Sequence, residues 1–224
     1  NLQSASRINV DADYLNLNNG TSAVTLGAFA LTFGGAGTDS LSGVLTGAGA
    51  ITKDGSGILV LNADNGSSYT GNITTSANGG MIRVLNNNAL GSTSGTTTVG
   101  SGSTIQLSGD LLSIPEPFIL NGNGVDVNQG AIRNPNGNNT ITGTITLASS
   151  ARVVSAGSSV ADSLVLKGNI VTISGAILSM DVIKGMRLTG LISGAGGITK
   201  NNSDTLLLYG NAANTYSGIT TIND

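Results

Sequence analysis

Carboxylates are the side chains of this chain best suited to chemistry, and they are few. The 224 residues include 12 Asp and Glu and 9 Lys and Arg, with no His and no Cys. Hydrolysis of a glycosidic bond usually needs two carboxyl groups that face each other across the bond. On stacked strands such groups would lie about one layer apart, and three sets are loosely suitable: Asp110 with Glu116, Asp126 with Asp110, and Asp162 with Asp181.

Polysaccharide lyase chemistry needs acidic cation ligands and a basic side chain instead. Arg152 near Asp126 or Asp162 is the nearest candidate for that base. In a chain with so few charges, solvated turn residues explain these acids better than a site does. We therefore predict no enzymatic activity, and we assign no catalytic residue and no cofactor.

One segment has the pattern of a calcium-binding repeat. Gly34-Gly-Ala-Gly-Thr-Asp-Ser-Leu41 fits the nonapeptide motif, with Asp39 as the ligand. Such sites hold each ion between consecutive turns, and no second copy of the motif follows at the repeat distance. We predict a glycine-rich corner here and assign no metal-binding residue. Gly47-Ala-Gly49 and Gly194-Ala-Gly196 are also interpreted as turns, because no helix and no phosphate-binding Lys follows them.

Two lysines occupy equivalent corners. Lys53 and Lys200 are predicted to pair with Asp54 and Asp204. Exposed ion pairs of this kind contribute about 0–1 kcal/mol. These charges are therefore expected to be solvated rather than functional.

Two tyrosines also occur at matched positions. Tyr69 and Tyr216 are predicted to pack in the core or at a corner, and a platform for stacking carbohydrate is the alternative. Glycosylation sequons at Asn19, Asn65 and Asn72 are interpreted as chance matches in a chain rich in Asn, Ser and Thr.

Composition excludes several classes of partner. Charged residues make up 9% of the chain, the net charge is −3 and the mean hydropathy is +0.20. No basic stripe exists to neutralise phosphates, so nucleic-acid binding is not expected. The longest apolar runs, such as residues 58–61, are far shorter than the roughly 20 residues of a membrane helix, and we expect no membrane insertion of this segment.

The elements that carry these residues are predicted to be short β-strands. Alternating apolar and polar residues recur, helical periodicity is scarce, and Asn-Gly or Asp-Gly turns separate the runs. The runs cover residues 8–10, 14–17, 23–26, 30–33, 82–85, 96–99, 104–107, 140–147, 163–166 and 171–174. An antiparallel sandwich or hairpin array would fit this pattern, and so would a parallel β-helix.

An internal repeat favours the β-helix. Lys53 returns as Lys200, 147 residues later, and the correspondence holds over segments 46–76 and 193–223. Repeated strand-turn-strand units suggest stacked coils that bury their faces against one another. We predict an all-β, single-stranded parallel β-helix of roughly ten coils, each of roughly 20–25 residues, forming one domain over 1–224. Proline cannot donate to a ladder, so Ile114-Pro-Glu-Pro117 predicts a loop or insertion around 113–118.

These residues resemble the autotransporter-associated β-strand repeat of bacterial secreted and surface proteins. The pattern is carried by Gly49-Ala-Ile-Thr-Lys53, Gly55-Ser-Gly-Ile-Leu-Val-Leu61, Tyr69-Thr-Gly71, Gly196-Gly-Ile-Thr-Lys200 and Gly218-Ile-Thr-Thr221. The resemblance covers most of 41–224. It implies a right-handed parallel β-helix that is exported to the cell surface or beyond and carries no catalytic residues. Lys200-Asn-Asn-Ser departs from the Lys-x-Gly turn of the first copy, so a looser second corner is expected.

The expected function is structural. We predict an extracellular or cell-surface stalk segment, or the head-to-tail subunit of a fibre; an adhesin that binds cell-surface glycans is the alternative. The side chains predicted to point inward are Leu59, Leu61, Ile105, Leu107, Leu147, Leu206 and Leu208. The chain starts without an initiator Met, as a mature product or an excised segment would. No cap is visible after the strand predicted at 220–222, so a longer chain or a second subunit is expected to stack there.

Overall fold

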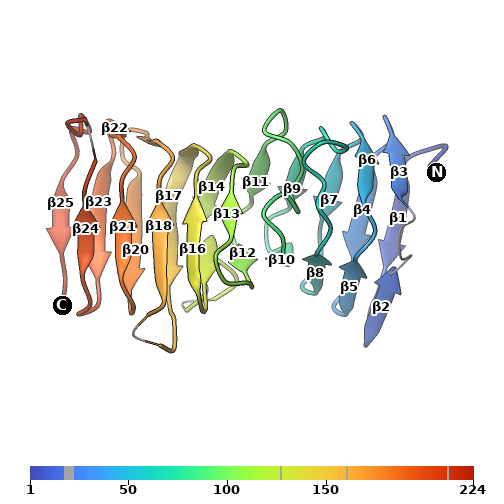
Figure 1. Ribbon diagram of the computed structural model, residues 1–224, viewed down its shortest axis with the longest axis horizontal. Coiled ribbons are helices and arrows are strands. Elements are labelled where there is room, and N and C mark those ends of the chain that lie inside the picture. The colour runs from blue at the N-terminus through green and yellow to red at the C-terminus, as the bar shows by residue number, and fades with distance from the viewer. Residues whose placement is uncertain (18–22, 127, 160, 211) are drawn as a thin grey trace.

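The computed structural model is a parallel β-solenoid (Figure 1). It describes residues 1–17, 23–126, 128–159, 161–210 and 212–224. Every strand pairing in these ranges is parallel. The two termini lie at opposite ends of the long axis, and the strands run across that axis. The chain makes about nine turns, against the roughly ten that we predicted.

The strands form three faces of the solenoid, and those of face 3 belong to two separate sheets. Face 1 contains β1 (Ser6–Asn9), β4 (Leu31–Gly34), β7 (Ile51–Lys53), β9 (Ile73–Thr75), β11 (Thr97–Val99), β14 (Phe118–Gly122), the start of β17 (Ile145–Ser155), β19 (Ile170–Thr172) and β22 (Ile192–Gly194). Face 2 contains β2 (Tyr14–Leu17), β5 (Thr38–Leu41), β8 (Ile58–Leu61), β10 (Gly80–Val84), β12 (Ser103–Leu107), β15 (Ile132–Asn134), the end of β17, β20 (Ile177–Val182), β23 (Gly197–Asn201) and β25 (Thr220–Ile222). Face 3 contains β3 (Val24–Gly27), β6 (Leu45–Gly47), β13 (Ser113–Ile114), β16 (Asn138–Ile141), β18 (Ser163–Leu166), β21 (Met186–Leu188) and β24 (Leu206–Leu208).

Turn length varies along the solenoid because the corners differ in length. Leu31 pairs with Ile51, only 20 residues later, whereas Phe118 pairs with Ile145, 27 residues later. The turn from Ala151 to Leu178 is also 27 residues long. The pairings shift register between Thr25 and Gly27 and between Leu120 and Gly122, near the ends of β3 and β14.

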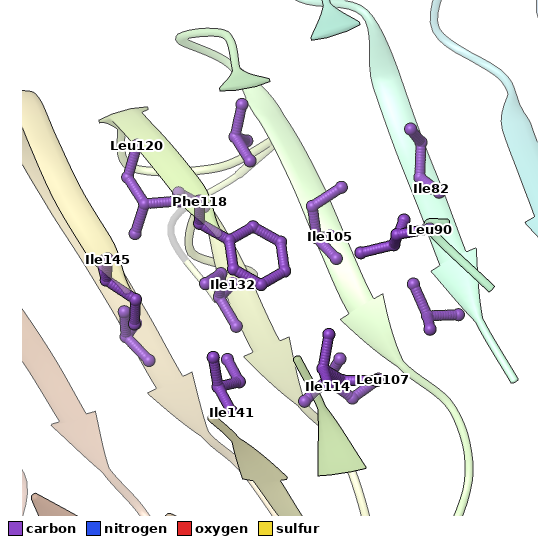
Figure 2. Packing of buried hydrophobic residues seen from close by; sticks show 14 of the residues in the cluster. Ile82, Leu90, Ile105, Leu107, Ile114, Phe118, Leu120, Ile132, Ile141 and Ile145 are labelled. Atoms are coloured by element: carbon purple, nitrogen blue, oxygen red, sulfur yellow. The ribbon is translucent and has the colours of Figure 1, made fainter. Parts of the chain in front are cut away.

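The core is a shaft of aliphatic side chains enclosed by the three faces (Figure 2). Alternate residues of each strand point inward, as the period of a strand requires. The predicted inward residues Leu59, Leu61, Ile105, Leu107 and Leu147 are all fully buried, which confirms that part of the prediction. Burial of each such side chain contributes roughly 1.5–3 kcal/mol.

The two leucines predicted to point inward in the last coil are less buried than the others. Leu208 is 43% exposed, and Leu206 is half-buried although it packs against the core. Leu206 pairs with Met186 and Leu208 pairs with Leu188, the inward-facing residues of β21. Both leucine side chains therefore point inward, as predicted. They remain open because no strand among the described residues pairs with β24 on its far side.

The two copies of the repeat share a local structure. Gly47 and its equivalent Gly194 have φ values of 106° and 103°. Gly55 turns the first corner with φ of 79°, and Asn202 turns the second with φ of 67°. Asn tolerates this left-handed conformation, so the second corner keeps the same turn rather than loosening.

The copies nevertheless lie on different faces. Ile51 belongs to β7 on face 1, whereas its equivalent Ile198 belongs to β23 on face 2. Six full turns and one further face separate the two strands. The sequence repeat is therefore rotated by one face about the solenoid axis.

A column of glycines forms the corner between faces 3 and 1. One glycine lies two residues before each of β7, β9, β11, β17, β19 and β22, namely Gly49, Gly71, Gly95, Gly143, Gly168 and Gly190. A Cβ on Gly143 would lie 1.8 Å from the carbonyl oxygen of Glu116, so the column has no room for side chains that point along it. Glu116 holds the equivalent position before β14. The loop predicted around 113–118 is thus a three-residue corner between β13 and β14.

Candidate functional site

Two opposite charges are buried between β5 and β7. Asp39 of β5 is fully buried, and it pairs with Leu15 of β2 on one side and with Leu59 of β8 on the other. Neither of its carboxyl oxygens has a hydrogen-bond partner. Burial raises the pKa of Asp39, and the nearby Lys53 ammonium partly opposes that shift. The pKa of Lys53 is lowered, mainly by burial.

Lys53 closes its corner from the inside. Its Nζ donates to the carbonyl oxygens of Asp54 and Gly55, each at 2.9 Å. The predicted Lys53–Asp54 ion pair is therefore wrong: the Asp54 carboxylate binds Arg7 of β1 at 2.7 Å instead. The hydrogen bond from Arg7 is the main reason that the pKa of Asp54 is lowered.

Lys200 repeats this arrangement at the second corner. Its Nζ donates to the carbonyl oxygen of Asn202, which is equivalent to Gly55. Its ion pair is with Asp224, at 3.4 Å, and not with the predicted Asp204. In both copies the lysine is the last inward-facing residue of its strand. Its ammonium therefore donates to carbonyl oxygens of the corner and does not pair with the acid that was predicted.

The calcium-like segment 34–41 places its carboxylate in the interior. Asp39 lies beside the Lys53 ammonium rather than beside other acids. Within the part of the chain that the structure describes, no three His, Cys, Asp or Glu side chains gather as a metal site would require.

Glu116 is a second buried carboxyl group. It is 1% exposed, and neither of its oxygens has a hydrogen-bond partner. Burial raises its pKa to about 8, and the adjacent Thr97 hydroxyl lowers it by a smaller amount. At neutral pH the folded chain therefore holds Glu116 mostly protonated, facing the glycine column beside Gly95.

The structure does not bring the predicted carboxylate sets together. Asp110 is exposed in a turn, where it accepts backbone hydrogen bonds from Leu111 and Asn138, whereas Glu116 is buried. Asp126 is exposed and accepts from the backbone of Asn128. Neither pairing with Asp110 forms two carboxyls across a cleft.

The third set, Asp162 with Asp181, has different partners for its two acids. Asp162 accepts hydrogen bonds from the backbone of Ser159 and Gly137, which lower its pKa. Asp181 lies on face 2, where it forms an ion pair with Arg152 at 3.5 Å. The ion pair places Arg152 beside Asp181 on face 2.

The two tyrosines differ in burial. Tyr69 is fully buried, and its hydroxyl donates to the carbonyl oxygens of Gly49 and Asn72. Burial raises the pKa of Tyr69, with a smaller contribution from Glu116. Core packing is thus confirmed for Tyr69. Tyr216, on the open last coil, is half-buried and contacts Thr220 through its hydroxyl.

The sequons lie in three different settings. Asn65 is buried, and its side chain bonds Leu45 and Ala89 across neighbouring coils. Asn72 is exposed, and its Oδ1 accepts from the Thr96 backbone. Asn19 lies outside the described residues.

A groove of about 490 Å³, with both polar and apolar lining, lies at the corner between faces 2 and 3. It is lined by Arg83 and Leu85, by Gln106 and the turn at 108–110, and by the turn at 135–137. These residues lie at or just after the ends of β10, β12 and β15, three successive strands of face 2. The sequence analysis missed the groove because no short motif contains residues that are about one coil apart.

The C-terminal end has an apolar opening. The inward positions Ile198, Leu206, Leu208 and Ile222 line a cavity of about 110 Å³ that faces outward along the axis. Ile222 is 70% exposed, whereas its equivalent Thr75 and the neighbouring Ile73 are buried. In the first copy, β10 and β11 cover the positions that remain open here.

Comparisons of the chain with protein-family models, with curated proteins and with solved structures found no match. Among the residues that the structure describes, no helix is long and apolar enough to cross a membrane. The groove and the open end are therefore interpreted from their own geometry.

Proposed function

We propose that this chain is a structural β-solenoid, used as a stalk segment or as the head-to-tail subunit of an extracellular fibre. The open C-terminal coil is the observation that carries the proposal. Its inward side chains Leu206, Leu208 and Ile222 need a further layer to leave water, and the edges of β24 and β25 offer backbone groups to a parallel strand.

The internal repeat indicates what such a layer looks like. The coil after the first copy places Ile82 and Val84 of β10 directly on Leu59 and Leu61 of β8. Leu206 and Leu208 are the equivalents of those two leucines. A solenoid coil is thus the kind of structure that covers this surface, whether it comes from the same polypeptide or from another copy. Contact between unlike ends propagates into a filament.

The extracellular location belongs to the same proposal. It is supported by the resemblance to exported repeats that segments 46–76 and 193–223 carry. Antibody labelling of intact source cells tests it: label confined to permeabilised cells would contradict it.

Sedimentation velocity and electron microscopy test the open end. About nine turns at the usual inter-strand spacing give a rod on the order of 40 Å long. We expect such rods to join end to end as the protein concentration rises. Leu208→Asp should abolish this growth, because a charge at the edge prevents strand addition. Leu111→Asp is the matched control, since Leu111 is 74% exposed on the side of the solenoid.

The outcomes separate the forms of the proposal. Single rods at every concentration would reject the subunit form and leave the stalk segment. Growth that Leu208→Asp and Leu111→Asp reduce equally would show that the open end is not the joining surface. Turnover of a polysaccharide by the purified chain would contradict a purely structural role.

Glycan binding is a second candidate function, and the groove between faces 2 and 3 is the observation that favours it. Its volume suits a small sugar, and its lining combines apolar carbon with amide, hydroxyl and charged groups. A glycan array without hits would remove this candidate and leave the structural role unaffected.

A further inference from the structure

We propose that the groove between the ends of β10, β12 and β15 binds a sugar carboxylate, as found in a uronic acid. The proposal rests on the second candidate function and specifies the class of glycan. It is carried by the juxtaposition of Arg83, Gln106 and Asp110 with the apolar carbon of Leu85 and Pro135.

The cation in the groove is not neutralised. The Nε of Arg83 is buried without a hydrogen-bond partner, and no ion pair within the described ranges involves Arg83. A guanidinium presents a planar fork of donors that matches a carboxylate. A guanidinium that has no ion pair among the described residues therefore favours an anionic ligand in this hollow.

The neighbouring arginine provides a contrast. Gln106 pairs with Arg83 of β10 on one side and with Arg133 of β15 on the other, so the three side chains lie in one row across face 2. The Nη1 of Arg133 donates to Gln129 Oε1 at 2.7 Å, and Arg133 does not line the groove. Only Arg83 therefore combines an unused guanidinium with access to the hollow.

The other polar groups suit hydroxyls better than a second anion. Gln106 Nε2 donates to Ser108 Oγ at 2.8 Å, and the Oε1 of Gln106 remains as an acceptor. Asp110 lines the groove and uses Oδ1 for two backbone hydrogen bonds, which leaves Oδ2 as an acceptor for a hydroxyl. Its negative charge opposes a phosphate dianion more strongly than a carboxylate monoanion.

Apolar carbon completes the fit to a sugar ring. Leu85 and Pro135 line the same hollow and can pack against the C–H face of a pyranose. A volume of about 490 Å³ holds a short segment of chain rather than an extended polymer. The ligand class is therefore an acidic oligosaccharide, with one carboxylate on Arg83.

Calorimetry with trigalacturonate as the probe tests the assignment. The controls are the neutral trisaccharide of galactose and the peptide triglutamate. We expect binding of trigalacturonate alone, weakened by added salt. Arg83→Gln should reduce the affinity about ten-fold or more, because a hydrogen bond to a charged group is lost. Arg133→Gln should leave it unchanged.

Three results would overturn the proposal: equal binding of the neutral sugar, equal binding of triglutamate, or equal losses in Arg83→Gln and Arg133→Gln. The absence of any binding of trigalacturonate up to its solubility limit would also overturn it. A glycan array with only neutral hits would refute the carboxylate but keep the glycan-binding function. End-to-end assembly should be identical in Arg83→Gln and wild type, so failure here does not affect the structural role.

Discussion

Replacing Glu116 by Gln is expected to remove a pH dependence of stability that the wild-type chain carries. The Glu116 carboxyl is 1% exposed, and its oxygens have no hydrogen-bond partner. Burial raises its pKa from an ordinary value of 4.5 to about 8. The folded chain therefore keeps a proton that the unfolded chain releases at lower pH.

The direction and size of the effect follow from proton linkage. Between pH 4.5 and about 8 the unfolded chain binds fewer protons at this site, so the free energy of unfolding falls as the pH rises. The stability is fully present below pH 4.5 and is lost by the time the pH has passed about 8. The separation of the two pKa values corresponds to about 5 kcal/mol in total, of which about 3 kcal/mol is lost at pH 7.

Urea unfolding followed by circular dichroism, at about pH 5 and about pH 9, measures this loss. Gln keeps the shape of Glu without its charge. Its extra N–H lacks a partner, which costs about 1–3 kcal/mol at every pH, so the difference between the two pH values is the quantity to compare.

The matched control for charge is Asp13→Asn. Asp13 is exposed with φ of 61°, a conformation that Asn also tolerates. From about pH 5 to about pH 9, we expect the unfolding free energy of wild type to fall by about 3–5 kcal/mol more than that of Glu116→Gln. We expect Asp13→Asn to lose as much as wild type. Equal pH dependence in Glu116→Gln and wild type would refute the reasoning, because it would mean that Glu116 ionises in the fold at no cost.

Two further changes test the interior of the coils. Lys53→Met should lower the unfolding free energy by about 3–5 kcal/mol, because Asp39 and two corner carbonyls lose the buried ammonium. Adding Asp39→Asn should restore part of that loss, and an equally large effect of Lys200→Met on the open coil would contradict this explanation. Gly143→Ala should cost about 3 kcal/mol, since its Cβ would lie 1.8 Å from the Glu116 carbonyl oxygen. Gly185→Ala is its control, because the nearest atom there is at 4.0 Å; equal losses in thermal unfolding would disprove the steric account.

The strands and corners could be predicted because they depend on local pattern. Alternation at 58–61 and 104–107 places Leu59 and Ile105 in the shaft whatever the neighbouring coil contains. Gly55 and Asn202 turn their corners through the same left-handed conformation, which each residue type allows by itself. These features need only the residues next to them along the chain.

The candidate sites could not be predicted in the same way. Arg83, Gln106 and Asn136 come from three different coils, and their approach depends on the register of face 2. The prolines that flank Glu116 suggested an exposed loop, yet the neighbouring glycines leave space for the carboxyl inside. Lys53 lies next to Asp54 in sequence, but its inward direction leads it to the corner carbonyls.

The sequence alone determined that this chain builds short strands around an aliphatic interior, because inward and outward positions alternate within each strand. Its internal repeat favoured parallel coils over an antiparallel sandwich. The sequence also determined that segments 46–76 and 193–223 share one local structure. Only the tertiary structure decided that these segments lie on different faces, that Asp39 and Glu116 are enclosed, and that Leu208 is open. The position of a residue around the axis depends on the summed lengths of all the corners before it, which vary from turn to turn. Its burial depends on whether another coil lies above it.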